Sequence, residues 1–457
     1  MNFSPVDAKM TKFKPKPGRS STSELLAILA KAKISPEDVS LQILEDSTEV
    51  FSLNASTKKI PASISKLFTT FAIVKKFPIG HKFYTRLFTD GKNIYLVGGG
   101  DPSFVSENLW YLVNEFSRSG IKSVKGNVIV DDSLFDKIRY DESREANRVD
   151  RAYDAPVGAM SFNWNSVNIF VKPAKKDGDG ALVTIDPESN YFELINNTKT
   201  VSSAKKDPAE LVVTLSSTKR IITVSGEIRK GEGEKVIYKN VAEPDLWAGK
   251  NLVYFLKQRG ITVEGHIENG KVPADAELVA SFESKNLSYI MADMNKFSNN
   301  FVAEMLVKDL AAQEQKSGAT LRRGVDIIRA ELAKIGLSRD DVVFLNPSGL
   351  TRDNLFSAAA LNKALTEIKN DFSVYPVFLN GLPIAGVDGT LRKRMKNTIA
   401  EGWVRAKTGY LDGVVSLAGF AGKRDGAVLT FTFLYNGPRE ESIVREAFDQ
   451  LLINSLK

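Results

Sequence analysis

The segment that most restricts the fold lies between residues 61 and 74. Pro61 precedes Ser63, and the residues after them are apolar on nearly every side of a helix: Leu67, Phe68, Phe71, Ala72, Ile73 and Val74. A proline fits the start of a helix, and a helix without a polar face has to be buried. We therefore expect a buried helix that begins near Ser63.

Ser63 and Lys66 are the polar pair at the start of this helix. Residues three positions apart share one helix face, so the amine can take the proton of the hydroxyl. The start of a buried helix also directs free N–H groups and the positive end of its dipole at the hydroxyl, which favours an oxyanion. A lysine with the usual pKa of about 10.4 is rarely neutral at pH 7, so its use as a base requires burial or a second cation nearby.

The same spacing of serine and lysine occurs elsewhere without the apolar context. The other serines are Ser56, Ser119, Ser202, Ser203 and Ser216. They lie in polar turns or in segments rich in Thr and Lys, where solvated surface pairs are the norm. Ser63 is therefore the predicted nucleophile, and Lys66 is its predicted base.

Lys407-Thr408-Gly409 is a tripeptide that occurs once in the chain, directly after the alternating stretch 403–406 that predicts a strand. A glycine there lets a substrate backbone lie against the strand, while Lys407 and Thr408 can hold a carboxylate. Taken alone, the tripeptide also fits an ordinary strand end.

Ser298-Asn299-Asn300 precedes a segment with helical periodicity. Its polar side chains can face a cleft from the start of that helix. A simple helix N-cap at Ser298 or Asn299 explains the pattern equally well.

Length and composition exclude other classes of chemistry. A chain of 457 residues is too long for one hydrophobic core, so we expect two or more compact units, one of them inserted into another. The absence of cysteine excludes disulfides and thiolate chemistry. The two histidines, His81 and His266, have no partner at metal-ligand spacing, so we expect structural roles and no metal site.

Charge and hydropathy limit the classes of binding partner that the chain is expected to have. The net charge of +7 is modest and spread along the chain, with no basic run among aromatic residues, so we expect no binding to nucleic acid. The apolar stretches fall short of the roughly 20 residues of a membrane span. Met1 to Arg19 contains no apolar signal region, so we expect a mature or engineered form.

Together, the motifs at Ser63-Lys66, Ser298-Asn300 and Lys407-Gly409 make up the set found in penicillin-binding proteins and serine β-lactamases. The surrounding sequence resembles the D-alanyl-D-alanine carboxypeptidase family that contains the class C low-molecular-mass penicillin-binding proteins, peptidase family S13. The segments that carry this resemblance are Ile60–Ser63 with Lys66-Leu67, Gly99–Pro102, Ala155–Asn165, Met294–Lys296, Ala303-Glu304, Asn346–Arg352 and Ala385–Leu391.

The resemblance implies an α/β (α+β) fold. A transpeptidase-like domain, with an antiparallel sheet flanked by helices, would comprise residues 20–92 and 274–457. The long gap between Lys66 and Ser298 resembles the insertion of accessory domains in this family, and residues 93–273 would form two small β-rich domains.

The resemblance also implies roles. Ser63 would be the acylated nucleophile, Lys66 its base and Ser298 a proton relay. Substrate would be bound by Asn300, Lys407, Thr408, Gly409 and Tyr410, with the backbone N–H groups of Ser63 and Tyr410 as the oxyanion hole. The enzyme would cleave the D-Ala-D-Ala bond of peptidoglycan peptides in the periplasm without a cofactor, and β-lactam antibiotics would be covalent inhibitors. Related enzymes also cleave cross-links as endopeptidases.

Two positions depart from the family pattern. Tyr410 stands where Thr or Ser is usual, and Asn346-Pro347 replaces the more usual Asp-Gly. Two alternative functions stay open, a serine β-lactamase and a non-catalytic protein that binds peptidoglycan.

Overall fold

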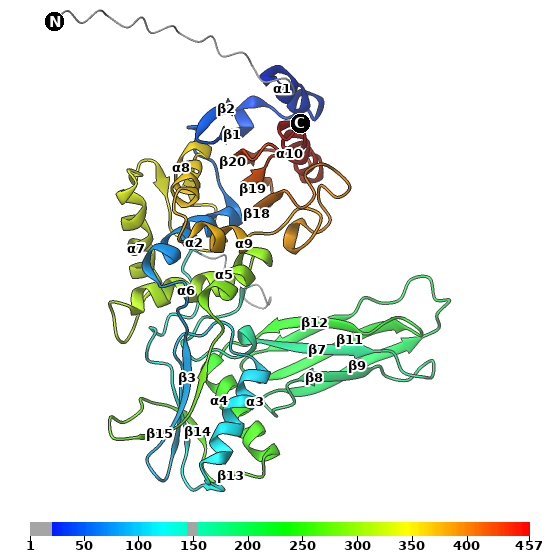
Figure 1. The fold of residues 1–457 in the computed structure, drawn as a ribbon. Helices are drawn as coiled ribbons and strands as arrows, with labels where there is room; N and C mark the ends of the chain where they lie inside the picture. Colours follow the sequence, from blue (N-terminus) through cyan, green and yellow to red (C-terminus); the bar gives the residue numbers. More distant parts are fainter. Residues whose placement is uncertain (1–20, 144–153) are drawn as a thin grey trace, which may run out of the picture.

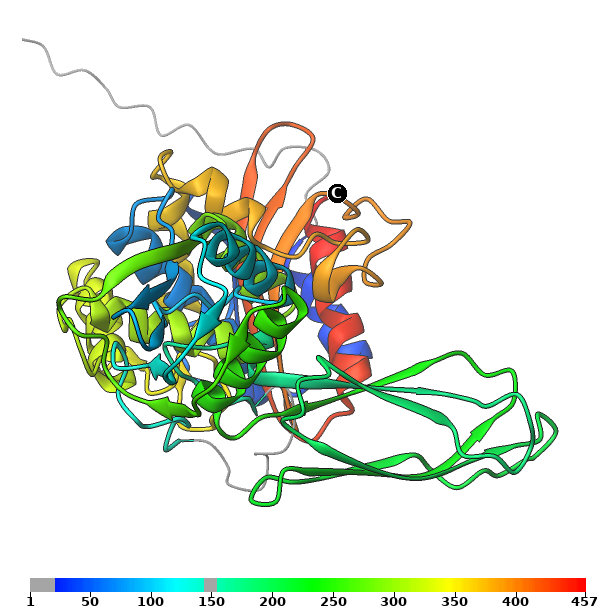
Figure 2. The ribbon, with the colours of Figure 1, turned by 90° about the horizontal axis from the view of Figure 1, so that it is seen from below.

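The computed structural model describes residues 21–143 and 154–457, so Met1–Arg19, where the sequence lacks a signal region, lies outside the described residues. The described residues form three units (Figure 1). The first unit contains both ends of the described chain, and the second lies beside its helical part. The third projects as a long arm, which Figure 2 shows from below.

The first unit is built on a five-stranded sheet in the order β18-β19-β20-β1-β2. All neighbouring strands are antiparallel. The strands are β1 (Val39–Glu45), β2 (Thr48–Leu53), β18 (Val404–Leu411), β19 (Val414–Gly422) and β20 (Val428–Asn436). Their side chains alternate between two apolar layers, one on each face of the sheet.

Helices cover both faces of this sheet. The helices α1 (Thr22–Lys31) and α10 (Glu441–Ser455) pack on one face. The other face carries a helical layer that contains α2 (Ser65–Lys76), α5 (Leu287–Lys296), α6 (Asn300–Ala312), α7 (Leu321–Lys334), α8 (Ala358–Lys369) and α9 (Tyr375–Asn380). Two short strands, β16 (Val342–Val343) and β17 (Leu355–Phe356), pair with each other beside this layer. The predicted antiparallel sheet flanked by helices is confirmed.

The helix α2 is buried on all sides, as the run after Pro61 predicts. In the fully described stretch from residue 61 to residue 74, Ser63 is the one residue that is not buried. Phe68 contacts Phe344 and Phe356 edge to face, which fixes the helix against β17 and the segment before it.

The second unit has a mixed sheet in the order β14-β6-β4-β3-β15. Its strands are β3 (Tyr84–Thr89), β4 (Ile94–Val97), β6 (Val128–Asp131), β14 (Ile267–Asn269) and β15 (Glu277–Glu283), with a small pair of β5 (Ser123–Val124) and β13 (Thr262–Val263). Two helices, α3 (Ser106–Arg118) and α4 (Pro244–Gln258), pack with it. The resemblance implied β-rich accessory domains here, and these two helices were not predicted.

The pairing of β3 with β15 bears on the domain boundaries. These strands lie outside residues 93–273, one on each side, yet they belong to the same sheet as β4 and β6. We therefore propose that the inserted region begins near residue 83 and ends near residue 284.

The third unit is the arm, which consists of two three-stranded sheets. One contains β12-β7-β8 and the other β10-β11-β9. The strands are β7 (Ser166–Lys172), β8 (Leu182–Asp186), β9 (Glu193–Val201), β10 (Val212–Ser216), β11 (Ile221–Arg229) and β12 (Lys235–Asn240). Apolar residues from both sheets join the core of the second unit, so the arm and that unit are packed as one body.

The two histidines lie apart from each other in the fold. His81 packs against Phe77 and Phe83, and burial lowers the pKa of its imidazole. His266 is exposed beside Glu268. Among the described residues, no group of side chains has the geometry of a metal site, and no helix is long and apolar enough to span a membrane.

Candidate active site

Ser63 lies in the short 3₁₀ turn η2 (Ala62–Ile64), directly before α2. Ala62 has a left-handed backbone with φ of 51°, a conformation that costs a residue with a side chain about 1–3 kcal/mol. The surrounding contacts hold this turn in place, because the Ser416 hydroxyl donates to the Pro61 carbonyl at 2.6 Å. Ser63 is thereby presented at the start of a buried helix, with its side chain partly accessible.

Lys66 lies one turn further along and is fully buried. Its Nζ is 3.2 Å from Ser63 Oγ, 2.7 Å from Asn300 Oδ1 and 2.5 Å from the carbonyl oxygen of Ser348. The amine is therefore held against the nucleophile by groups from two other segments. Asn300 was predicted as a substrate-binding residue, whereas Ser348 lies in the segment 346–352 that carries the family resemblance and had no predicted role.

The segment 346–349 forms a tight turn around this amine. Asn346 Oδ1 accepts hydrogen bonds from the backbone N–H groups of Ser348, Gly349 and Leu350 and from the Ser348 hydroxyl. The Asn346 Nδ2 donates to Asp141 at 2.6 Å. Asparagine at this position thus supplies both an acceptor for the turn and a donor to a carboxylate.

Gly349 allows the turn to approach the nucleophile. Its φ is +77°, and an added Cβ would lie 2.0 Å from the Ala62 carbonyl oxygen and 3.0 Å from the Ser63 nitrogen. A side chain at Gly349 would push the turn away from η2, and the Ser348 carbonyl would move away from Lys66 with it.

Glu304 is a buried carboxylate that the sequence analysis did not assign to the site. It lies one turn after Asn300 on α6, and its Oε1 lies 3.1 Å from Ser348 Oγ. Its signal in the sequence was its spacing of four residues from Asn300, which places both side chains on one helix face.

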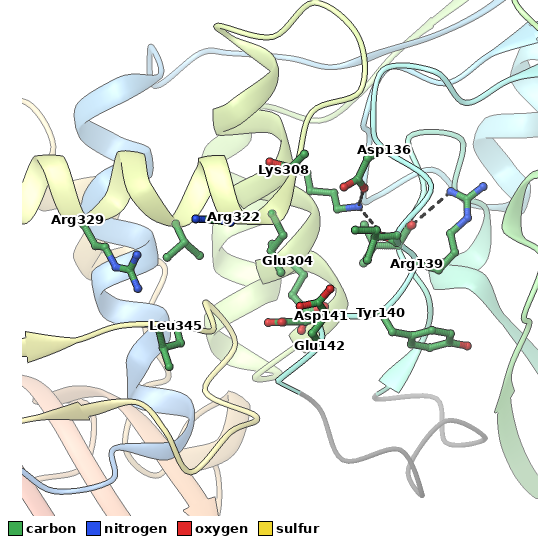
Figure 3. Close-up of a pocket in the computed structure, with 15 residues that line it drawn as sticks. Asp136, Arg139, Tyr140, Asp141, Glu142, Glu304, Lys308, Arg322, Arg329 and Leu345 are labelled. Carbon is green, nitrogen blue, oxygen red and sulfur yellow. Dashed lines mark hydrogen bonds and ion pairs between the residues drawn. The ribbon is translucent and has the colours of Figure 1, made fainter.

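A cavity of about 460 Å³ lies between α6, α7 and the loop 136–142 (Figure 3). Lys308 lines it and reaches Asp136 and the Ile138 carbonyl. Glu304 lines this cavity and also contacts Ser348, whose carbonyl accepts from Lys66.

Ser298 and Lys407 form the opposite side of the site. Ser298 precedes α6 with a left-handed φ of 56°, and Asn299 is the N-cap whose side chain accepts from the Val302 N–H. The N-cap alternative therefore applies to Asn299. Lys407 Nζ lies 2.8 Å from Ser298 Oγ, and burial lowers the pKa of Lys407 to about 7.

Gly409 brings β18 into contact with the turn that carries the nucleophile. An added Cβ would lie 2.1 Å from Ser416 Oγ, 2.7 Å from the Pro61 carbonyl and 3.1 Å from the Ser63 nitrogen. The sequence predicted that this glycine lets a substrate backbone approach the strand. The structure gives it a second task, the close packing of β18 on η2.

β18 is an edge strand of its sheet in the part of the chain that the structure describes. The segment 383–385 covers its first half, with the Ala406 N–H donating to Pro383 and the Ala385 N–H donating to Val404. In an antiparallel strand, the backbone groups of alternate residues face the same edge. The N–H and C=O groups of Thr408 and Tyr410 therefore face the uncovered half of this edge.

Tyr410 extends its side chain away from Ser63. Side chains alternate along a strand, and Val404 and Ala406, which have the same parity as Tyr410, pack on the face that carries α10. The Tyr410 hydroxyl lies 3.1 Å from Glu441, and the Arg445 guanidinium lies over its ring at 4.9 Å. The ring is 53% exposed beside the site.

The other serines with a lysine three positions on lie away from this site. Ser56, Ser119, Ser202 and Ser203 are exposed, and Ser216 is partly buried in β10 of the arm. By contrast, the three motifs selected in the sequence meet at one place, because Lys66 contacts Asn300 and Lys407 contacts Ser298.

The model of the family described as "D-Ala-D-Ala carboxypeptidase 3 (S13) family" matches residues 22–455. The chain belongs to this family. It is therefore a serine peptidase of the D-Ala-D-Ala carboxypeptidase type, as the motifs indicated.

Individual relatives agree with the family. A D-alanyl-D-alanine carboxypeptidase of Actinomadura sp. (strain R39) is 32% identical over 411 residues, which cover 85% of this chain and 75% of the relative. The carboxypeptidase DacB of Haemophilus influenzae is 26% identical over 401 residues, which cover 84% of this chain and 82% of that protein.

Solved structures share the fold. Penicillin binding protein 4 of Haemophilus influenzae aligns with a TM-score of 0.80 at 23% identity, covering 95% of this chain and 99% of that chain. The predatory peptidoglycan endopeptidase Bd3459 of Bdellovibrio bacteriovorus aligns with a TM-score of 0.51 at 16% identity, covering 91% of this chain and 92% of that chain.

Proposed function

We propose that the protein cleaves the terminal D-Ala-D-Ala bond of peptidoglycan stem peptides through an acyl-enzyme on Ser63. The observation that carries this proposal is the contact of Lys66 with Ser63, Asn300 and Ser348 at the start of a buried helix. Membership of the S13 family supports the choice of substrate.

Lys66 acts as the base in its neutral form. A neutral amine has two N–H groups, which Asn300 Oδ1 and the Ser348 carbonyl can accept, and its lone pair then faces Ser63 Oγ. The Ser63 proton moves to Lys66 as Oγ attacks the carbonyl carbon of the penultimate D-alanine. The backbone N–H groups of Ser63 and Tyr410 stabilise the resulting oxyanion.

Ser298 and Lys407 protonate the leaving amine. Their contact of 2.8 Å provides a path from Nζ through Oγ to the nitrogen of the scissile bond. A pKa of about 7 suits Lys407 to proton transfer at neutral pH. The C–N bond breaks and D-alanine leaves, after which Lys66 releases its proton to solvent and Lys407 regains one. A water then attacks the ester on Ser63 while the neutral Lys66 takes up its proton, and that proton passes to Ser63 Oγ as the ester bond breaks.

The substrate lies along the uncovered half of β18. Thr408 and Tyr410 present backbone groups there, and Lys407 and Thr408 hold the terminal carboxylate in this proposal. Asn300 orients the substrate peptide as well as Lys66. Cleavage of cross-links as an endopeptidase uses the same groups, since only the leaving amine differs.

The test measures D-alanine release from an acyl-D-Ala-D-Ala peptide. We expect release by the wild type and none above background by Ser63→Ala, with Ser56→Ala as a matched control that keeps full activity. Release that is unchanged in Ser63→Ala would refute the assignment of the nucleophile. No release by either protein would favour a protein that only binds peptidoglycan.

A serine β-lactamase is the nearest alternative. The Haemophilus influenzae penicillin binding protein 4 has been solved in complex with a β-lactam, which supports β-lactams as covalent inhibitors of this chain. We expect a long-lived adduct with benzylpenicillin, and rapid turnover of the drug would favour the β-lactamase instead. Because peptidoglycan lies outside the cytoplasmic membrane, we propose a periplasmic location.

A further inference from the structure

The uncovered half of the β18 edge ends at the segment 383–391, which we call the strap. The first residues of the strap run antiparallel to β18. The Ala406 N–H donates to the Pro383 carbonyl at 3.0 Å. The Ala385 N–H donates to the Val404 carbonyl at 2.9 Å. The first half of this edge is therefore occupied by the protein's own chain.

The strap then turns back and contacts both walls of the active site. On the wall formed by the end of α5, an added Cβ on Gly389 would lie 2.7 Å from the Lys296 carbonyl oxygen. On the wall formed by β18, the Thr408 hydroxyl donates to Thr390 Oγ1 at 2.8 Å. Residues 389–390 therefore bridge the two walls beside Thr408.

Asp388 holds this bridge in place. Its carboxylate pairs with Lys296 and accepts from the Ile384 N–H at 2.8 Å. An added Cβ on Gly389 would also lie 3.2 Å from Cβ of Pro383, so the outgoing and returning parts of the strap pack against each other. The strap is thus fixed to α5 and closed on itself.

The register along β18 gives the length of chain that the groove can hold. In the proposed function, the Tyr410 N–H binds the reacting carbonyl and Lys407 and Thr408 bind the terminal carboxylate, so the substrate runs antiparallel to β18. Successive residues of antiparallel strands lie opposite each other and advance by about 3.4 Å. The residue before the scissile bond then lies opposite Tyr410, the released residue opposite Gly409, and any further residue opposite Thr408.

We propose that the strap closes the groove one residue beyond the scissile bond and restricts cleavage along β18 to a single C-terminal residue. A second residue would meet Thr390 opposite Thr408, and a longer chain would meet Pro383. This inference rests on the proposed function and adds the length of the leaving group to its specificity. A leaving residue that is linked to a second stem through its side chain keeps its own carboxylate free, so the strap does not exclude endopeptidase cleavage.

The test compares two substrates without a charged carboxylate, acyl-D-Ala-D-Ala amide and acyl-D-Ala-D-Ala-Gly amide. They differ only in the glycyl residue that would lie opposite Thr408, and mass spectrometry of the products measures cleavage of the same D-Ala-D-Ala bond. For the wild type, we expect kcat/KM to be at least about 10-fold lower for the glycyl amide, because overlap with packed atoms persists unless the strap moves. Equal values, including no cleavage of either amide, would overturn the proposal.

Two variants should open the end of the groove. Asp388→Ala removes the ion pair with Lys296 and the acceptor for the Ile384 N–H. Thr390→Gly removes the side chain that reaches Thr408. We expect both variants to raise kcat/KM for the glycyl amide toward the value for the amide, whereas a general loss of structure would lower both values together.

Asp371→Ala is the matched control for Asp388→Ala. Asp371 also pairs with a lysine, Lys75, and accepts a backbone N–H from Ser373, in the loop between α8 and α9. It should leave the ratio of the two kcat/KM values unchanged. A ratio that stays at the wild-type value in both strap variants would overturn the role of the strap. Absence of D-alanine release from acyl-D-Ala-D-Ala by the wild type would instead refute the proposed function itself.

Discussion

Replacing Gly409 by alanine should separate the nucleophile from β18. The added Cβ would lie 2.1 Å from Ser416 Oγ and 2.7 Å from the Pro61 carbonyl oxygen. To restore ordinary contact distances, β18 and η2 have to move apart by about 1 Å, and overpacking of this kind costs about 1–3 kcal/mol of unfolding free energy. A displacement of about 1 Å in a catalytic site lowers the rate on the order of 10²-fold.

The assay is the rate of acylation by a fluorescent penicillin, measured beside thermal unfolding. Gly422→Ala is the control in the same sheet, because its added Cβ would approach only the ring of Trp403, at 3.3 Å. Acylation of Gly409→Ala at the wild-type rate would refute the packing argument.

Three further predictions concern charged and polar groups. Burial and the nearby Asp101 raise the pKa of Asp309, so its carboxyl binds a proton more tightly in the folded protein than in the unfolded chain. Asp309→Asn should therefore raise the unfolding free energy at pH 7, and this gain should vanish below about pH 4. Denaturant titrations at both pH values would measure the difference. Burial lowers the pKa of Lys407 to about 7, so kcat/KM for a substrate with a free carboxylate should fall as the pH rises through this value. The fall should be smaller for an amidated substrate, which needs the Lys407 proton for the leaving amine but not for carboxylate binding. Asn346→Asp should place a second carboxylate against Asp141 and thereby lower the unfolding free energy by about 1–3 kcal/mol at pH 7. The double variant that also carries Asp141→Asn should recover this loss of unfolding free energy.

The sequence predicted the parts of the site that depend on local pattern. The apolar run after Pro61 distinguished Ser63 from the other serines, because burial of a helix is visible in its own residues. The alternation before Lys407 predicted a strand, and β18 begins at Val404. The order of the motifs then indicated the fold of the first unit, which the structural comparisons confirm.

Contacts between distant segments could not be derived in this way. The Ser348 carbonyl reaches Lys66 across 282 positions of the chain, and no local pattern encodes that approach. The pairing of β3 with β15 is of the same kind, and it moves the proposed domain boundaries. The Tyr410 side chain points to the face of the sheet that carries α10, which can be derived from the alternation along β18 only after that face is known. A tyrosine in place of the usual Thr or Ser therefore changes the side chain on that face and leaves the backbone N–H of residue 410 at the uncovered edge.

The central claim is that Ser63 is the acylated residue, and mass spectrometry tests it most directly. The protein is treated with benzylpenicillin, its intact mass is measured, and the modified peptide is sequenced. We predict a single adduct, on Ser63, that is absent from Ser63→Ala. An adduct on another serine, or an adduct that persists in Ser63→Ala, would contradict the account.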